Sequence, residues 1–210
     1  MTLPPEHAFA GLKRNGYQAI YCDPPWRFAT WNKATAVKSR KNKSTFGSAN
    51  VHYNTMPTVD ICRLPVWELC ADDCVLFLWA SWPMLNDALR VIDAWGFQYK
   101  TCGFDWSKAN ASQPDMFLEE MRGAMGMGYW TRANTEPCLI ATKGKPKRLK
   151  ADVRMSIIEP RREHSRKPAR VHGDIERLIS GPYVELFARQ SRPGWDVWGN
   201  ETSKFGEAAA

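Results

Sequence analysis

Four consecutive residues have the types and the spacing to activate an amino group for chemical attack. Asp23, Pro24, Pro25 and Trp26 directly follow the apolar run at residues 17–22. The exocyclic amine of a nucleobase is a poor nucleophile because its lone pair is delocalised into the ring. Asp23 can accept one N–H bond of such an amine and the Pro24 carbonyl another, while the Trp26 ring stacks against or walls off the base. The two prolines hold these acceptors rigidly.

Taken alone, Asp-Pro-Pro also fits a strand that ends in a stiff surface loop. The rest of the chain favours the catalytic interpretation, because further motifs follow in a characteristic order. They lie at residues 53–56, 76–79, 136–140, 143–144, 163–168, 184–189, 194–195 and 198–201. From about residue 17 to residue 200, the chain resembles the MT-A-seventy family of DPPW-type, S-adenosylmethionine-dependent adenine-N6 methyltransferases. It looks most like the compact bacterial and phage members.

The resemblance implies a reaction and a cofactor site. Family members move the methyl group of S-adenosylmethionine to the N6 amine of adenine by in-line displacement, and no metal is needed. Residues 23–26 would form the catalytic motif. The cofactor-binding residues that it implies are Asp23, Lys167, Glu185, Arg189, Asn200 and Glu201. Lys167 would meet the cofactor carboxylate, and the last three would surround its ribose and adenine. The short segment 190–194 leaves the ribose contacts open, and Glu185 could instead be structural.

The substrate side has its own candidates. They are Tyr53, Trp106, Lys108, Trp130, Asn134 and Glu136. Trp106 and Trp130 lie in polar stretches, so each could stack on a base or pack in the core. Most of the ten tryptophans are expected to be core residues, among them Trp67, Trp79 and Trp95. Glu136 keeps the spacing from Trp130 that the family shows in its loop near the target adenine.

The charge balance suits a polyanionic partner. The chain carries 29 Lys+Arg against 22 Asp+Glu, a net charge of +7. One basic stretch leads from the catalytic motif toward Tyr53 and contains Lys33, Lys38, Arg40, Lys41 and Lys43. We expect it to contact phosphates, giving salt-dependent affinity without sequence preference. A second basic stretch contains Lys143, Lys145, Lys147, Arg148 and Lys150. Taken alone, it is more often a solvated loop.

Length and composition predict a compact enzyme. A chain of 210 residues with 44% hydrophobic content can bury one sizeable core. We expect a single methyltransferase domain at residues 1–202, flexible at 1–14, with a disordered tail at 203–210. No apolar stretch reaches the roughly 18 residues that span a membrane, and no signal peptide is expected. The six cysteines form no zinc pattern, which favours buried free thiols in a reducing cytoplasm.

Hydrophobic patterning predicts an α/β fold. Strands are expected at residues 17–22, 74–79, 97–106, 137–142, 183–188 and 195–198. Helices are expected at 83–95 and 170–180, with a weaker one at 58–69 that Pro65 interrupts. This alternation predicts a Rossmann-like sheet with helices on both faces, which binds its cofactor at the carboxyl edge of the strands. The catalytic motif precedes the cofactor motif, so the motif order is expected to be circularly permuted.

The substrate is expected to be DNA, and RNA adenosine stays open. A target adenine in a duplex must be flipped out. No separate recognition domain is visible, so specificity would come from loops or a partner subunit, and a homodimer or heterodimer stays open. Two alternatives remain: a catalytically silent, nucleic-acid-binding subunit, and methylation of a cytosine amine or of protein.

Overall fold

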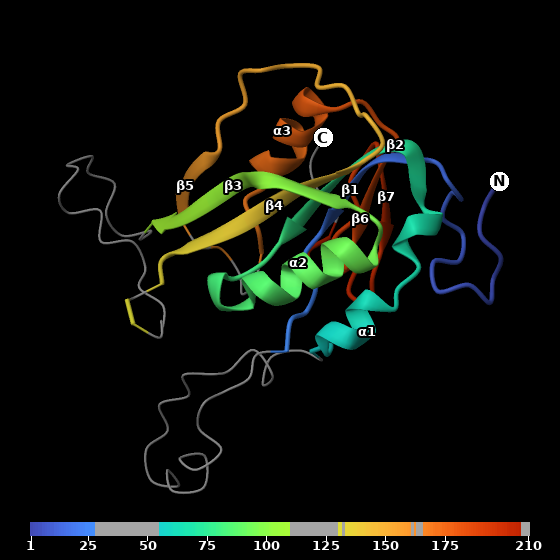
Figure 1. Ribbon diagram of the computed structural model, residues 1–210, viewed down its shortest axis with the longest axis horizontal. Helices are drawn as coiled ribbons and strands as arrows, with labels where there is room; N and C mark the ends of the chain where they lie inside the picture. The colour runs from blue at the N-terminus through green and yellow to red at the C-terminus, as the bar shows by residue number, and fades with distance from the viewer. Residues whose placement is uncertain (28–54, 110–129, 132, 161, 163–165, 207–210) are drawn as a thin grey trace, which may run out of the picture.

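A mixed β-sheet forms the centre of the protein (Figure 1). The computed structural model describes residues 1–27, 55–109, 130–131, 133–160, 162 and 166–206. The strands within these residues are β1 (Tyr17–Cys22), β2 (Cys70–Trp79), β3 (Gln98–Ala109), β4 (Thr135–Lys143), β5 (Ser156–Pro160), β6 (Tyr183–Leu186) and β7 (Trp195–Trp198). They lie in the order β5-β3-β4-β2-β1-β6-β7.

Short helices connect the strands. The helical elements of the described chain are α1 (Thr58–Cys62), η2 (Val66–Glu68), η3 (Trp82–Met84), α2 (Leu85–Ala94) and α3 (Arg170–Leu178), with η marking 3₁₀ turns. Pro65 separates α1 from η2 as expected, because it cannot continue a helix. Gly96 follows the end of α2 at a φ of 77°, a conformation that glycine adopts without strain.

The sheet buries both of its faces. Side chains alternate along β1, so Ile20 and Cys22 join the hydrophobic cluster beneath α1 and α2, whereas Ala19 and Tyr21 join the cluster beneath α3. Figure 1 shows α1 and α2 together on one side of the sheet and α3 apart from them. The predicted α/β architecture with helices on both faces is therefore confirmed. The circular permutation is a comparison with other methyltransferases and stays a prediction.

Strand direction decides which residues meet at the catalytic edge. β1 pairs in parallel with β2 and β6, and β6 pairs in parallel with β7. β4 is antiparallel to both β2 and β3. β4 therefore begins at the edge where its neighbours end, because antiparallel strands run in opposite directions. Its first residues therefore lie beside the residues that follow β2, as the hydrogen bond from the Ala80 N–H to the Pro137 carbonyl shows.

Four details differ from the sequence-based expectations. Within residues 1–14, which were expected to be flexible, Leu3, Phe9 and Leu12 are buried in the main core. In the expected tail, Phe205 donates its backbone N–H to the Arg189 carbonyl at 3.2 Å, and residues 207–210 lie outside the described chain. β5 was not predicted, because Ile157 is its only buried residue. Trp67 was expected in the core but is 45% exposed.

Candidate active site

The catalytic motif forms a rigid turn at the end of β1. The Pro24 carbonyl accepts the Trp26 backbone N–H at 2.8 Å, and the Pro25 carbonyl accepts that of Met56 at 2.7 Å. The Trp26 indole N–H donates to the Trp79 carbonyl at 3.0 Å. Trp26 is buried, so its ring is not free to stack on a base, and the alternative that it walls off the base stays a prediction. Its ring instead fixes the motif to the end of β2.

A buried ammonium group joins two carboxylates beside this turn. Lys167 Nζ lies 2.9 Å from Asp23 Oδ2 and 3.2 Å from Glu136 Oε2. Lys108 forms a further ion pair with Glu136. Lys167 precedes α3, Glu136 is the second residue of β4 and Lys108 the last but one of β3, so three distant segments meet at one edge. The result is an alternating row of charges, Lys108, Glu136, Lys167 and Asp23.

Burial and ion pairing set the protonation of this row in opposite directions. Burial raises the pKa of Asp23, and the nearby Lys167 and Arg189 only partly oppose this. Burial would also raise the pKa of Glu136, but Lys167 and Lys108 outweigh it and lower the pKa to about 2. Burial favours neutral Lys167, yet the two carboxylates raise its pKa above the usual range. Asp23 is thus the most basic carboxylate of the row.

A cleft of about 320 Å³ opens beside Asp23, between the ends of β1, β6 and β7. It is lined by Asp23, Pro25, Phe187, Ala188, Arg189, Asn200 and Glu201. This volume lies within the range of small-molecule sites. Arg189 Nε lies 3.7 Å from Glu201 Oε2, and Asn200 is exposed. The structure therefore brings together three residues that the family resemblance assigns to cofactor ribose and adenine.

Two backbone features shape this cleft. Phe187 adopts a φ of 60°, an uncommon conformation for a residue with a side chain, and it turns the chain sharply after β6. Gly199 follows β7 so closely that an added Cβ would lie 2.8 Å from the Ala188 carbonyl oxygen. Only glycine allows the loops after β6 and β7 to approach in this way.

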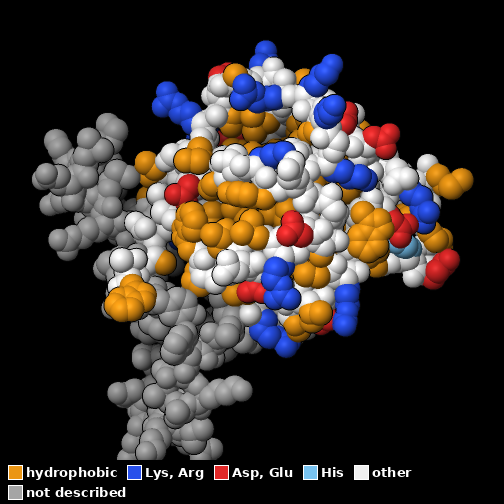
Figure 2. Space-filling view, in the orientation of Figure 1, with side chains coloured by type: hydrophobic (Ala, Val, Ile, Leu, Met, Phe, Trp, Pro, Cys, Tyr) orange, Lys and Arg blue, Asp and Glu red, His pale blue; other side chains and the backbone are white. Residues whose placement is uncertain are grey.

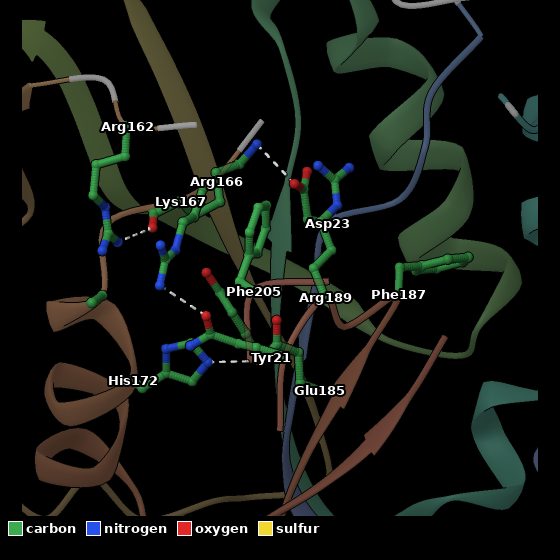
Figure 3. A pocket seen from close by; sticks show the side chains of 12 residues that line it. Tyr21, Asp23, Arg162, Arg166, Lys167, His172, Glu185, Phe187, Arg189 and Phe205 are labelled. Atoms are coloured by element: carbon green, nitrogen blue, oxygen red, sulfur yellow. Dashed lines mark hydrogen bonds and ion pairs between the residues drawn. The ribbon is translucent and has the colours of Figure 1, made fainter. Parts of the chain in front are cut away.

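A second cavity continues from Asp23 beneath Lys167 (Figure 3). Figure 3 shows Lys167 reaching toward Asp23, with His172 and Glu185 together at the other end of the view. His172 Nε2 lies 2.7 Å from Glu185 Oε2, so Glu185 is held by a specific partner. Sequence reasoning missed His172, although its place on the buried face of α3, five residues after Lys167, was a usable signal. It also missed Tyr21, which accepts the Trp79 indole N–H at 2.7 Å.

The remaining substrate-side candidates are divided. Trp106 is buried, and its indole N–H donates to the Glu159 carbonyl at 2.9 Å, so it is a core residue. Lys108 lies over the Trp106 ring at 5.3 Å. Asn134 is exposed and accepts the Lys108 backbone N–H through its carbonyl. Trp130 is fully exposed, which leaves its ring accessible. Tyr53 lies outside the described residues.

The two basic stretches have different outcomes. Lys38, Arg40, Lys41 and Lys43 lie outside the described residues, so their phosphate contacts stay a prediction. The second stretch follows the end of β4, whose Lys143 pairs with Cys74 near the start of β2. This is the edge of the sheet opposite Asp23. Figure 2 shows several Lys and Arg side chains at the top of the molecule, where the loop between β4 and β5 crosses in Figure 1. This stretch therefore lies away from Asp23, and a contact with nucleic acid stays a prediction.

Comparison with known proteins places this geometry in a family. The model of the MT-A70 (MT-A-seventy) family matches residues 17–201. The chain belongs to the MT-A70 family. This match spans Asp23, Glu136, Lys167 and the cleft residues up to Glu201. The chain is therefore a methyltransferase by family, and the expected resemblance is confirmed.

Named relatives come from bacteria and eukaryotes. The chain is 33% identical over 208 residues to the type II methyltransferase M.MunI of Mycoplasma sp, covering 94% of this chain and 83% of that protein. It is 28% identical over 189 residues to the human N(6)-adenosine-methyltransferase catalytic subunit METTL3, and 29% identical to the Drosophila melanogaster MT-A70-like protein. The chain spans 28% and 27% of the lengths of these two eukaryotic proteins.

Three further properties bear on the site. All six cysteines are free thiols, of which Cys62 and Cys102 are partly exposed. Among the described residues, no three of His, Cys, Asp and Glu gather as ligands of a metal ion. No helix in the described part of the chain is long and apolar enough to cross a membrane.

Proposed function

We propose that this protein transfers the methyl group of S-adenosylmethionine to the exocyclic N6 amine of adenine in DNA. The observation that carries the proposal is the position of Asp23. It lies on the wall of both cavities, directly before the two prolines, and it is the most basic carboxylate of the charged row. One side chain thus borders the cofactor cleft and faces the edge where a base would enter.

Asp23 and Pro24 would activate the amine. Oδ2 of the Asp23 carboxylate pairs with the Lys167 ammonium, and the other oxygen is an acceptor for one N–H of the amine. The Pro24 carbonyl already accepts the Trp26 N–H, but a carbonyl has a second lone pair for the other N–H. Two fixed acceptors concentrate electron density on the nitrogen as it attacks. The proton that leaves the nitrogen can be held by Asp23, whose pKa is raised by burial.

The lining of the two cavities fits S-adenosylmethionine. Lys167 and Arg189 offer cations to a carboxylate, while Asp23, Glu185 and Glu201 offer acceptors to an ammonium group and ribose hydroxyls. When bound, this cofactor supplies a methyl group that its sulfonium makes electrophilic. The Lys167 ammonium has three protons, and two carboxylates use two of them. The third is available to the cofactor carboxylate.

We prefer DNA over RNA as the substrate because the chain matches a type II methyltransferase over most of that protein's length. A type II methyltransferase matches 94% of the chain and is itself covered over 83% of its length. The RNA alternative is supported by the N(6)-adenosine-methyltransferases, of which the chain covers about a quarter. A protein that uses this cofactor and DNA is expected in the cytoplasm. A homodimer or heterodimer stays a prediction, and sedimentation of the purified protein would test it.

Product analysis tests the proposed function. Purified protein is incubated with methyl-labelled S-adenosylmethionine and either DNA or RNA, and the digested nucleosides are separated. Label in N6-methyldeoxyadenosine is the expected result. Label in N6-methyladenosine would establish the RNA alternative, and label in cytosine or protein would refute the adenine assignment. Nucleic-acid binding without any label in the product would indicate a silent subunit. Asp23→Asn protein is the matched control for background transfer.

A further inference from the structure

Trp82 is an exposed tryptophan at the catalytic edge. It begins η3, just after β2 ends at Trp79, and it is 46% exposed. Exposure alone carries no argument, because isolated exposed apolar side chains are common and Trp67 is almost equally exposed. What distinguishes Trp82 is how its ring is held and where it lies.

A hydrogen bond holds the Trp82 ring at one end of η3. Its indole N–H donates to the Thr135 hydroxyl oxygen at 2.8 Å. The Thr135 side chain also opposes the rise in the Asp105 pKa that burial causes. The buried side chain of Met84 anchors the other end of η3. Trp82 is therefore a pre-oriented ring with part of its surface in solvent.

The same contacts place Trp82 beside the reacting groups. Thr135 directly precedes Glu136, which pairs with Lys167 at 3.2 Å, and Lys167 pairs with Asp23. The backbone N–H of Ala80 donates to the Pro137 carbonyl at 3.0 Å, which ties the chain after β2 to the start of β4. In the sheet order, β4 and β7 lie on opposite sides of β1 and β2. Trp82 is thus on the side of Asp23 away from the cofactor cleft.

We propose that Trp82 is a stacking platform for an unpaired base that neighbours the target adenine. The proposal rests on the proposed function, because an adenine presented to Asp23 must leave its stack and its neighbours then lose a stacking partner. An aromatic side chain replaces that partner without regard to base identity. Trp26 and Trp106 cannot do so, since both rings are buried and their N–H groups donate to carbonyls within the fold.

Binding of a labelled oligonucleotide tests this platform. Wild type, Trp82→Ala, Trp82→Phe and Trp67→Ala are compared by fluorescence anisotropy with a short single-stranded DNA carrying one adenine. Trp82→Ala should raise Kd by about 5- to 150-fold, the factor that corresponds to loss of one base–aromatic stack. Trp82→Phe should retain most of the affinity. Trp67→Ala is the matched control, because Trp67 precedes β2 at the opposite edge of the sheet, and its Kd should equal that of the wild type.

A second oligonucleotide identifies the contacted base. It carries abasic sites on both sides of the adenine, so the phosphates remain and only the neighbouring bases are lost. Wild type should bind it more weakly by a similar factor, whereas Trp82→Ala should lose little further affinity. Thr135→Val removes the hydrogen bond to the Trp82 indole N–H but leaves the Trp82 ring in place. Its loss of oligonucleotide affinity should be intermediate. If Trp82→Ala does not fold, as judged by circular dichroism, Trp82→Phe, Thr135→Val and the abasic comparison in wild type decide the question.

Three outcomes would overturn the platform: a Trp82→Ala affinity equal to that of Trp67→Ala, an equal loss on intact and abasic DNA, or no binding of the oligonucleotide by the wild type. Methyl transfer to the same oligonucleotides is measured in parallel. Transfer by the wild type without dependence of binding on Trp82 would refute the platform alone. Binding that depends on Trp82 without any transfer would refute the proposed function and support the platform.

Discussion

The most consequential side chain at the residue scale is Lys167. It is buried, and its ammonium is shared between Asp23 and Glu136. A buried carboxylate needs such a counter-charge, because the loss of hydration otherwise favours the protonated form. Lys167 therefore opposes the rise in the Asp23 pKa that burial causes. The ionised carboxylate, held beside this counter-charge, is an acceptor for the N–H of an amine.

Asp23→Asn separates the charge of this acceptor from its shape. The asparagine amide has nearly the same volume, but an NH₂ group replaces one carboxylate oxygen. Two N–H donors, one from the amide and one from the target amine, would then face each other. Methyl transfer should fall at least about 10²- to 10³-fold, the value of one preorganised acceptor. Rates are measured with labelled cofactor, and circular dichroism checks the fold. Near-normal turnover in a folded variant would contradict the role of Asp23.

Lys167→Ala tests the shared cation in two ways. Binding of S-adenosylmethionine should weaken by about 1.5–3 kcal/mol, the range of a charge-assisted hydrogen bond, as calorimetry would show. Removal of the cation should also raise the pKa of Asp23, so the acidic limb of the pH–rate profile should move to higher pH. Lys167→Arg keeps the charge and should move this limb less. Unchanged cofactor affinity would refute the cofactor contact.

At the scale of elements, the direction of β4 and the turns after β6 and β7 form the site. β4 is antiparallel to β2, so Glu136 at its start reaches the carboxyl end of β1. The turn at Phe187 and the close approach at Gly199 bring Arg189 and Glu201 to the same edge. No single element contains the site, because each contributes only the residues at one of its ends.

Two glycine substitutions should have opposite effects. A Cβ at Gly199 would lie 2.8 Å from the Ala188 carbonyl oxygen, so Gly199→Ala should force the two loops apart. It should destabilise the protein by about 1–3 kcal/mol and weaken cofactor binding. Gly173 lies inside α3, and nothing lies within 4 Å of an added Cβ. Gly173→Ala should stabilise the protein by about 0.5–1 kcal/mol. Urea unfolding measures both changes, and effects of equal sign would refute the packing argument.

At the scale of the whole molecule, two hydrophobic clusters cover opposite faces of one sheet. The charged row lies against the cluster beneath α3, where Lys167 lies over the Trp79 ring and Lys108 over the Trp106 ring. Tyr21 and Trp79 belong to the cluster beneath α3, whereas Trp26 belongs to the cluster beneath α1 and α2. The Trp26 indole N–H donates to the Trp79 carbonyl at the end of β2. The Trp79 indole N–H donates to the Tyr21 hydroxyl oxygen near the end of β1. The stability of the fold and the ionisation of the site are therefore coupled.

Acid unfolding should reveal this coupling through Glu136. Its pKa falls from a model-peptide value of 4.5 to about 2 in the folded protein. A carboxylate whose pKa is lower in the folded than in the unfolded protein stabilises the folded state when it is ionised. This contribution of Glu136 is therefore complete above about pH 4.5 and is lost as the pH falls toward 2. The wild type should lose up to about 3 kcal/mol across this window from this group alone. Urea unfolding at several pH values measures it.

Glu136→Gln is the variant that isolates this contribution. It should be less stable than the wild type at pH 7 and should approach it near pH 2, because protonated Glu136 and glutamine are both neutral. Glu6→Gln, at an exposed position of the N-terminal segment, should follow the wild-type profile. Parallel profiles for wild type and Glu136→Gln would contradict the ion-pair network.

The sequence alone determined the parts that depend on local pattern. The apolar run before Asp23 predicted the strand, and the two prolines of the motif predicted the rigid turn. The helical spacing at residues 83–95 and 170–180 predicted both helices, which the structure has at residues 85–94 and 170–178. These predictions succeeded because side-chain periodicity and backbone restriction act within a few residues. The motif order likewise predicted the family, which the match over residues 17–201 confirms.

Only the tertiary structure decided which side chains meet and which are exposed. Strand order and the reversal of β4 pair Asp23 with Lys167 and Lys167 with Glu136. Burial of Trp26 and exposure of Trp82 follow from the same long-range packing, so residue type could not distinguish the ring that supports the fold from the ring that faces solvent. Ion pairing and burial depend on segments far apart in the chain, and a linear pattern does not record their approach.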